Sequence, residues 1–207
     1  MQMANLETKE SSFQWYRDFF KRELDIVISL VAIIALGIPM IIIAIYVKKD
    51  DPHAKIWFRQ ERAGEDNRPF VIYKFRTMVD SAPHQMATEE FNNSQAYITG
   101  IGKVLRKTSL DELPQLFNVL KGEMSLIGPR PLIPKEQKVL GMRNQLGANK
   151  VLPGITGLAQ VHGRDELSDK KKAMYDGQYA NQVSLILDMK IFYKTIFDVI
   201  RSKGIKG

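Results

Sequence analysis

The sequence predicts a mainly helical α+β chain, in which one membrane helix is followed by a domain that contains a short β-hairpin. Residues 26–47 form an uninterrupted run of uncharged and mostly apolar residues. Residues 56–62 and 69–78 are rich in β-branched and aromatic side chains, and a short loop of turn formers separates them, as in a hairpin. Residues 185–200 repeat apolar side chains at helical spacing.

The composition fits one folded domain with an attached membrane element. The chain has 207 residues, of which 44% are hydrophobic and 26% charged, as is ordinary for a protein with a core. It contains no cysteine, which excludes disulfides, iron–sulfur clusters, thiolate zinc sites and a cysteine nucleophile. Residues 1–50 carry equal numbers of basic and acidic side chains, so the net charge of +7 belongs to the rest of the chain. A basic soluble part indicates a phosphate-bearing partner: nucleic acid, nucleotide or an anionic membrane face.

The apolar run at residues 26–47 is long enough for a membrane helix, which needs about 20 such residues. The run is not a cleavable signal peptide, because it is too long for the apolar core of one. In addition, acidic residues precede it and no small-residue cleavage site follows it. Pro39, two residues after Gly37, removes a backbone hydrogen bond and predicts a kink. We therefore expect an N-terminal amphipathic segment at residues 1–25, a membrane helix at residues 26–47 and a domain at residues 48–207.

The flanks of this helix leave its topology open. A spanning helix usually has its positive excess on one side. Here both flanks are basic, because Arg17, Lys21 and Arg22 precede the run and Lys48 and Lys49 follow it. Together with the proline, this fits a helix that dips into the membrane and returns to the same face. A tilted, kinked span fits the residues equally well.

Further elements follow in the soluble part. Residues 82–99 are polar and predict a loop with one helical turn. Residues 113–120 predict a short helix that ends at Gly122, where a left-handed cap would fall. Residues 135–149 predict a second helix, and the prolines and glycines of residues 153–163 predict a structured loop.

The helix expected at residues 185–200 has an apolar stripe with two interpretations. A stripe of this kind packs on a core more often than it lies on a membrane surface, so we favour the core. The stripe consists of Leu185, Ile186, Met189, Phe192, Tyr193, Ile196, Phe197 and Ile200.

The segment TSLDELPQ, residues 108–115, also has two interpretations. Ser109 and Glu112 fit a capping box, which explains the segment without chemistry. Pro114 fits better if Asp111 is the N-cap, because the proline then falls where no helical bond is lost. Asp111 would then lie at the positive end of a helix dipole, where an anion is also stabilised. A carboxylate beside a phosphate can attack phosphorus or hold magnesium, but local physics alone favours capping.

Several other polar residues are candidate ligands, and each also has a structural explanation. Arg130 lies between two prolines that fix its backbone, and its guanidinium is a fork for a phosphate or a salt-bridge partner. Lys74 and Arg76 alternate along a strand and could meet either a phosphate or solvent. The remaining candidates are Arg164, after the glycine-rich loop, and Asp188, in the last helix.

The order of these segments resembles the bacterial sugar transferase family, the monotopic phosphoglycosyl transferases. The likeness covers about residues 17–203 and consists of the apolar helix followed by YKFRTM, SLDELPQLFNVLKGEMSLIGPRPL, PGITGLAQVHGR and YANQVSLILDMKI. The resemblance implies transfer of a sugar-1-phosphate from a UDP-sugar to undecaprenyl (polyprenyl) phosphate with release of UMP, the first membrane step of surface glycan synthesis. It also implies a re-entrant membrane helix, interfacial amphipathic helices, and a catalytic domain on the cytoplasmic face of the bacterial inner membrane.

The resemblance further implies a role for each candidate residue. Asp111 is the expected nucleophile, which forms a covalent phospho-sugar in a ping-pong mechanism, and it is also the expected ligand of the cofactor Mg²⁺. Glu112 is its catalytic partner. The expected substrate-binding residues are Lys74, Arg76, Arg130, Arg164 and Asp188.

Two other classes of function compete with this reading. One is a membrane-anchored protein that binds nucleotide or polyprenyl phosphate without turnover, and the intact Asp111–Glu112 pair argues against it. Nucleic-acid binding is not expected, because the chain lacks a clustered Lys/Arg stripe with aromatic platforms. The expected partners are the UDP-sugar, the polyprenyl phosphate and membrane phospholipid. The identity of the sugar, the glycan pathway and homo-oligomerisation stay open.

Overall fold

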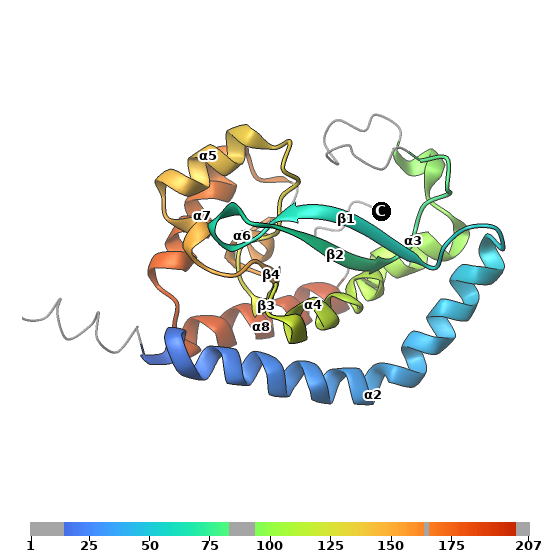
Figure 1. The fold of residues 1–207 in the computed structure, drawn as a ribbon, viewed down its shortest axis with the longest axis horizontal. Coiled ribbons are helices and arrows are strands. Elements are labelled where there is room, and N and C mark those ends of the chain that lie inside the picture. The colour runs from blue at the N-terminus through green and yellow to red at the C-terminus, as the bar shows by residue number, and fades with distance from the viewer. Residues whose placement is uncertain (1–14, 83–93, 164–165, 202–207) are drawn as a thin grey trace, which may run out of the picture.

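The computed structural model describes residues 15–82, 94–163 and 166–201, and it confirms a mainly helical chain with short strand pairs (Figure 1). The strands are β1 (Trp57–Ala63), β2 (Pro69–Phe75), β3 (Ser125–Ile127) and β4 (Gly154–Thr156). A π-helical turn, Tyr16–Phe20, leads into the first of the α-helices. These are α2 (Lys21–Asp50), α3 (Gly100–Thr108), α4 (Gln115–Lys121), α5 (Gln137–Gln145), α6 (Leu158–Val161), α7 (Asp169–Asn181) and α8 (Leu185–Ile200).

Helix α2 contains the apolar run and lies along one side of the molecule. Within the described residues it is the one helix long and apolar enough to cross a membrane. Figure 1 shows that it bends along its length, and Pro39 lies inside it. The proline ring clashes with the carbonyl four residues earlier and removes one helical hydrogen bond, which is the ordinary cause of such a bend. Most of its large apolar side chains, such as Ile34 and Ile38, are exposed.

Polar contacts attach the first half of α2 to the domain. The Arg22 guanidinium donates to the carbonyls of Val119 and Leu120 at 2.6 and 3.1 Å, near the C-terminal end of α4. There it gives the Leu120 carbonyl a donor and the Val119 carbonyl a second donor beside the Gly122 amide, and its charge opposes the negative end of the helix dipole. The Asp25 carboxylate accepts the amide of Leu126 at 3.1 Å. The apolar helix therefore packs on the domain along one face while its other face stays exposed.

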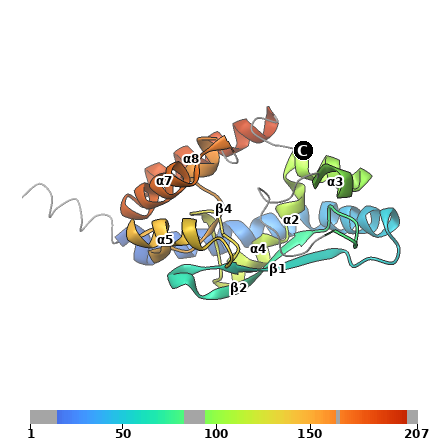
Figure 2. The same ribbon diagram turned by 90° about the horizontal axis from the view of Figure 1, so that it is seen from above.

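The expected hairpin is confirmed. Strands β1 and β2 pair antiparallel, with Trp57 opposite Phe75 and Ala63 opposite Pro69. Asp66 and Asn67 in the connecting turn have positive φ, a conformation that these two residue types tolerate better than most. The hairpin and the α7–α8 pair lie on the same side of α2 in Figure 1, and seen from above they flank its line, one on each side (Figure 2).

Strands β3 and β4 form a parallel pair that the sequence did not predict. The pairing needs glycine at its crossing point. A Cβ on Gly154 would lie 2.0 Å from the amide nitrogen of Gly128, so only glycines allow the two backbones to approach this closely. Residues 153–163, which were expected to form a structured loop, therefore contain both the short strand β4 and the short helix α6.

The bounds of α8 are as expected, but the favoured orientation of its apolar stripe is wrong. Seven members of the stripe are 40–70% exposed, from Met189 to Ile186. The core contact is made instead by Ile191 and Leu187, which pack with Ile127, Tyr179 and neighbouring residues. The exposed apolar face fits the second interpretation, a helix that lies on a membrane surface.

Candidate active site

Asp111 and Glu112 lie on a 3₁₀ turn, Leu110–Glu112, between α3 and α4. Ser109 ends α3 in the left-handed conformation (φ 57°) and so turns the chain into this segment. The neighbouring Leu110 and Leu113 pack against a cluster that includes Met40 of α2, Phe75 of β2 and Leu105 of α3. Apolar packing on both sides thus fixes the acidic pair above the second half of α2.

Neither capping interpretation of this segment is correct. The N-cap of α4 is Pro114, and no side chain caps this helix. Ser109 is both the C-cap of α3 and the residue at the start of the 3₁₀ turn, but its side chain makes no cap bond, so no capping box forms. Local capping therefore does not explain the acidic residues at positions 111 and 112. The explanation lies in the side chains that surround them.

Glu112 is surrounded by cations from distant parts of the chain. Its Oε1 accepts a hydrogen bond from Lys74 Nζ of β2 at 2.6 Å. The same oxygen lies 3.8 Å from Arg130 Nη1, on the loop after β3. Glu112 and Lys74 are largely buried, whereas the Arg130 side chain is 43% exposed. The guanidinium can therefore meet a ligand from solvent while it stays close to the acidic pair.

Asp111 is a buried carboxylate with cations around it. It is 8% exposed. Burial raises the pKa of Asp111, and Glu112 adds to the rise, while the charges of Lys74, Arg106 and Arg130 oppose it. A poorly solvated carboxylate beside several cations can accept an electrophile that brings its own negative charge, such as a phosphate.

Arg106 belongs to this site, and the sequence analysis missed it. It lies in the last turn of α3, and its Nε donates to Thr77 Oγ1 at 2.9 Å, which fixes the guanidinium. Its charge acts on Asp111, five positions further along the chain. The amphipathic pattern of residues 100–108 was the available signal, but no element was predicted for that stretch.

The other candidates do not all join this site. Arg76 is buried just beyond β2, and its Nη1 lies 3.4 Å from Asp80, an exposed residue four positions on. Asp188 is buried near the start of α8 and accepts hydrogen bonds from Tyr16, Lys21 and Tyr179. None of these partners of Asp188 contributes to the Asp111–Glu112 site. Arg164 lies outside the described residues.

The residues around the acidic pair are compatible with Mg²⁺. Over residues 15–82, 94–163 and 166–201, no cluster of three or more Asp, Glu or His side chains forms a ready metal cage. Magnesium does not require one, because it is commonly held by one or two carboxylates together with substrate phosphates. The carboxylate oxygens of Asp111 have this chemistry, and Glu112 is already paired with Lys74.

The chain is similar to a known family and to several named relatives over most of its length. The family model described as bacterial sugar transferase matches residues 16–202. "Uncharacterized sugar transferase EpsL" of Bacillus subtilis (strain 168) is 42% identical over 151 residues, which cover 73% of each chain. "Exopolysaccharide production protein ExoY" of Sinorhizobium fredii (strain NBRC 101917 / NGR234) is 34% identical, with 89% of this chain and 87% of the relative covered.

A longer relative has a more specific name. "UDP-glucose:undecaprenyl-phosphate glucose-1-phosphate transferase" of Klebsiella pneumoniae is 40% identical over 185 residues. The match covers 86% of this chain but 39% of the relative, so the similarity is confined to one part of that longer protein.

Proposed function

Because the chain belongs to the bacterial sugar transferase family, we propose that it transfers a sugar-1-phosphate from a UDP-sugar to undecaprenyl phosphate and releases UMP. The chain is thus a phosphoglycosyl transferase. The observation that carries the proposal is the buried Asp111 beside Glu112, with Lys74, Arg106 and Arg130 converging from three different elements. Such a concentration of cations is suited to a diphosphate.

Asp111 is the nucleophile in this mechanism. One carboxylate oxygen attacks the phosphorus that carries the sugar, and the bond from that phosphorus to the bridging oxygen breaks. UMP leaves with the bridging oxygen, and an acyl phosphate that carries the sugar remains on Asp111. The lipid phosphate then attacks the same phosphorus, which restores the carboxylate and yields the lipid diphosphosugar. The covalent intermediate lets a soluble donor and a lipid acceptor use one site in turn.

The surrounding side chains have separate tasks. Arg130, which is partly exposed, binds the donor's phosphates, and Arg106 balances the charge of Asp111 from the last turn of α3. Lys74 holds Glu112 in place at 2.6 Å. Asp111 would also hold Mg²⁺, which supplies further neutralisation of the diphosphate charge. The cations make attack by one anion on another feasible because they offset the repulsion between them.

The site fits a reaction at a membrane surface. The exposed apolar faces of α2 and α8 would lie in the bilayer and at its surface, respectively, with the acidic pair close above α2. The proposed location is the bacterial inner membrane, with the domain on its cytoplasmic face. The test of the whole proposal is release of UMP from a panel of UDP-sugars when undecaprenyl phosphate is present. Binding of the same substrates without UMP would contradict it and favour a non-catalytic binder.

We expect Arg130→Lys to lower kcat/KM for UMP release at least about tenfold, or about 1.4 kcal/mol of transition-state stabilisation. Lysine keeps the charge but loses the planar fork that binds two phosphate oxygens. Steady-state rates of UMP release measure the effect. Arg59→Lys, at the exposed surface of β1, is the matched control and should behave like the parent. Normal rates of UMP release in Arg130→Lys would reject this role for Arg130 and indicate that Arg106 or Arg164 binds the phosphates.

The acid limb of the pH–rate profile of the first half-reaction should report the ionisation of Asp111, because Asp111 acts as a carboxylate; burial is the main cause that raises its pKa. Lys74 opposes this rise, so Lys74→Met should raise the Asp111 pKa further and move the limb to higher pH. The measurement is kcat/KM for UMP release as a function of pH. Lys121→Met, on an exposed lysine near the same hairpin, is the control and should leave the limb in place. A limb that stays fixed or moves to lower pH in Lys74→Met would exclude Asp111 as its source.

We propose that α2 enters the membrane, bends at Pro39 and returns to the face from which it entered. Cysteines introduced at Asn5 and Asn67 should then both be protected from a membrane-impermeant thiol reagent in intact cells. The chain has no native cysteine, so each signal reports one position. Permeabilised cells, in which both positions should react, are the control. Labelling of position 5 alone in intact cells would establish a spanning helix.

A further inference from the structure

The backbone that presents Arg130 is held by hydrogen bonds from several distant parts of the chain. The segment Ile127–Leu132 runs from the end of β3 through Pro129, Arg130 and Pro131. Five of its six carbonyls accept a hydrogen bond from another part of the chain. The donors are Tyr179 Oη to Ile127, Gly154 N to Pro129, Arg143 Nη1 to Arg130, Arg62 Nη1 to Pro131 and Ala63 N to Leu132, all at 2.7–3.1 Å.

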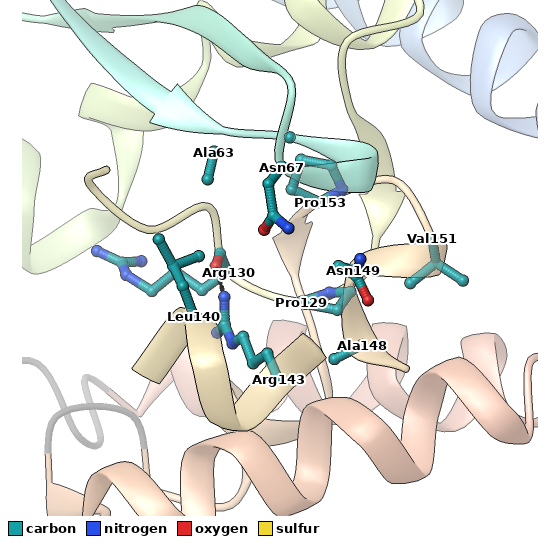
Figure 3. Close-up of a pocket in the computed structure, with 11 residues that line it drawn as sticks. Ala63, Asn67, Pro129, Arg130, Leu140, Arg143, Ala148, Asn149, Val151 and Pro153 are labelled. Atoms are coloured by element: carbon teal, nitrogen blue, oxygen red, sulfur yellow. Dashed lines mark hydrogen bonds between the residues drawn. The ribbon is translucent and has the colours of Figure 1, made fainter. Parts of the chain in front are cut away.

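The bond to Arg130 itself comes from Arg143 of α5. Arg143 Nη1 donates to the Arg130 carbonyl at 2.7 Å, and Figure 3 shows the side chain reaching from α5 to this backbone. The Arg130 guanidinium points away from Arg143 in the same view. The contact is therefore with the main chain of Arg130, and it leaves the Arg130 side chain available for the site.

Arg143 has a dedicated acidic partner. Its Nη2 lies 2.5 Å from Asp176 Oδ2 of α7. Arg143 is 6% exposed, and Asp176 is fully buried. One guanidinium thus forms an ion pair with a buried carboxylate and donates a hydrogen bond to a backbone carbonyl. A planar guanidinium held by these two contacts has little freedom left.

The pocket next to this contact lies between the hairpin turn, the Arg130 loop and α5. Arg143 lines this pocket, but it is almost fully buried, and its guanidinium is already engaged by Asp176 and by the Arg130 carbonyl. Any effect that Arg143 has on the reaction therefore acts through the chain that it touches.

Within this loop, the peptide that follows Arg130 can be anchored only at its carbonyl oxygen. Prolines on both sides fix φ at positions 129 and 131, but Pro131 has no amide to anchor the peptide that follows Arg130. The carbonyl of Arg130 belongs to that peptide, so a donor at this oxygen sets its orientation. The Arg130 guanidinium lies 3.8 Å from Glu112 Oε1, at the edge of the acidic pair. A shift of about 1 Å at a positioned group can lower a rate by about 100-fold.

We propose that Arg143, held by Asp176, is a positioning residue that sets the direction of Arg130 toward the donor phosphates. This inference rests on the proposed function, because it assumes the phosphate-binding role of Arg130. A buried ion pair that serves packing alone can often be replaced by apolar side chains at little cost. The bond from Arg143 Nη1 to the Arg130 carbonyl gives the pair a second task, which such a replacement would remove.

The test is a double-mutant cycle between the pair and Arg130. Arg143→Met alone leaves the Asp176 charge buried without its partner, so that variant could unfold. The variant Arg143→Met/Asp176→Leu removes both charges and avoids this problem. It is combined with Arg130→Ala, and kcat/KM for UMP release is measured in all four enzymes, with thermal unfolding in detergent as the measure of folding. Lys150→Met, which breaks an exposed ion pair with Asp66 close to α5, is the control and should keep the parent rate.

We expect the pair replacement to lower kcat/KM about tenfold when Arg130 is present and less than about twofold in Arg130→Ala, because the lost positioning then has nothing to act on. Equal losses in both backgrounds, or no loss when Arg130 is present, would overturn the inference. If the pair replacement fails to fold, the pair is a structural requirement and the inference is likewise overturned. A parent-like rate in Arg130→Ala alone is a different result, because it rejects the proposed role of Arg130.

Discussion

Asp111→Asn should release no UMP above background while the protein remains folded. The amide cannot form an acyl phosphate, so the first half-reaction is blocked at its chemical step. Asp111 is not a helix cap, and no cap is lost with it. Because burial raises the pKa of Asp111, its ionised form is disfavoured in the folded protein relative to the unfolded chain. A neutral isostere should therefore not lower the midpoint of thermal unfolding.

The parent enzyme provides the positive half of this experiment. Incubated with the UDP-sugar and Mg²⁺ but without lipid, it should release up to one equivalent of UMP per enzyme. The protein should become heavier by one phospho-sugar, and the added mass should lie on the peptide that contains Asp111. Glu112→Gln should slow both half-reactions but leave this stoichiometry unchanged, because the nucleophile is intact. Normal turnover by Asp111→Asn, or a label that maps to another residue, would reject the assignment.

The sequence was informative where one short segment contains the whole signal. Periodicity predicted the bounds of α8, and turn residues predicted the hairpin, because both depend on neighbours along the chain. The sequence did not predict which face of α8 is buried, since a core-facing stripe and a membrane-facing stripe have the same composition. Only the position of Ile191 among the residues that surround it distinguishes the two faces.

The candidate site was predicted only in part because it is assembled from distant segments. Asp111, Glu112, Arg130 and Lys74 were all candidates from motifs, but Lys74 lies 38 positions before Glu112, and spacing does not predict the contact between them. Arg106 was missed because it belongs to none of these motifs. Gly102 in the same helix is required by packing, since a Cβ there would lie 2.1 Å from the Thr77 carbonyl oxygen. The same Thr77 orients Arg106 through its hydroxyl group.

Asp188 shows how a residue within a family motif can be structural. Its Oδ2 accepts from Lys21 Nζ at 2.6 Å and from Tyr16 Oη at 2.9 Å, and its Oδ1 accepts from Tyr179 Oη at 2.8 Å. Burial and the Asp188 charge raise the pKa of Tyr179 well above its usual range, so this hydroxyl remains a donor. Through these contacts Asp188 joins the segment before the membrane helix to α7 and α8.

Asp188→Leu should therefore destabilise the protein by about 3–5 kcal/mol, because it leaves Lys21 poorly solvated and without its partner. The measurement is thermal unfolding in detergent. The Lys21→Met/Asp188→Leu variant removes both charges and should recover most of this loss, since no unpaired charge remains. The same double variant separates structure from substrate binding. If Asp188 is structural, the refolded variant should have a parent-like KM for the UDP-sugar. If Asp188 contacts the donor, KM should stay raised even though stability has returned, and the structural assignment would have to be abandoned.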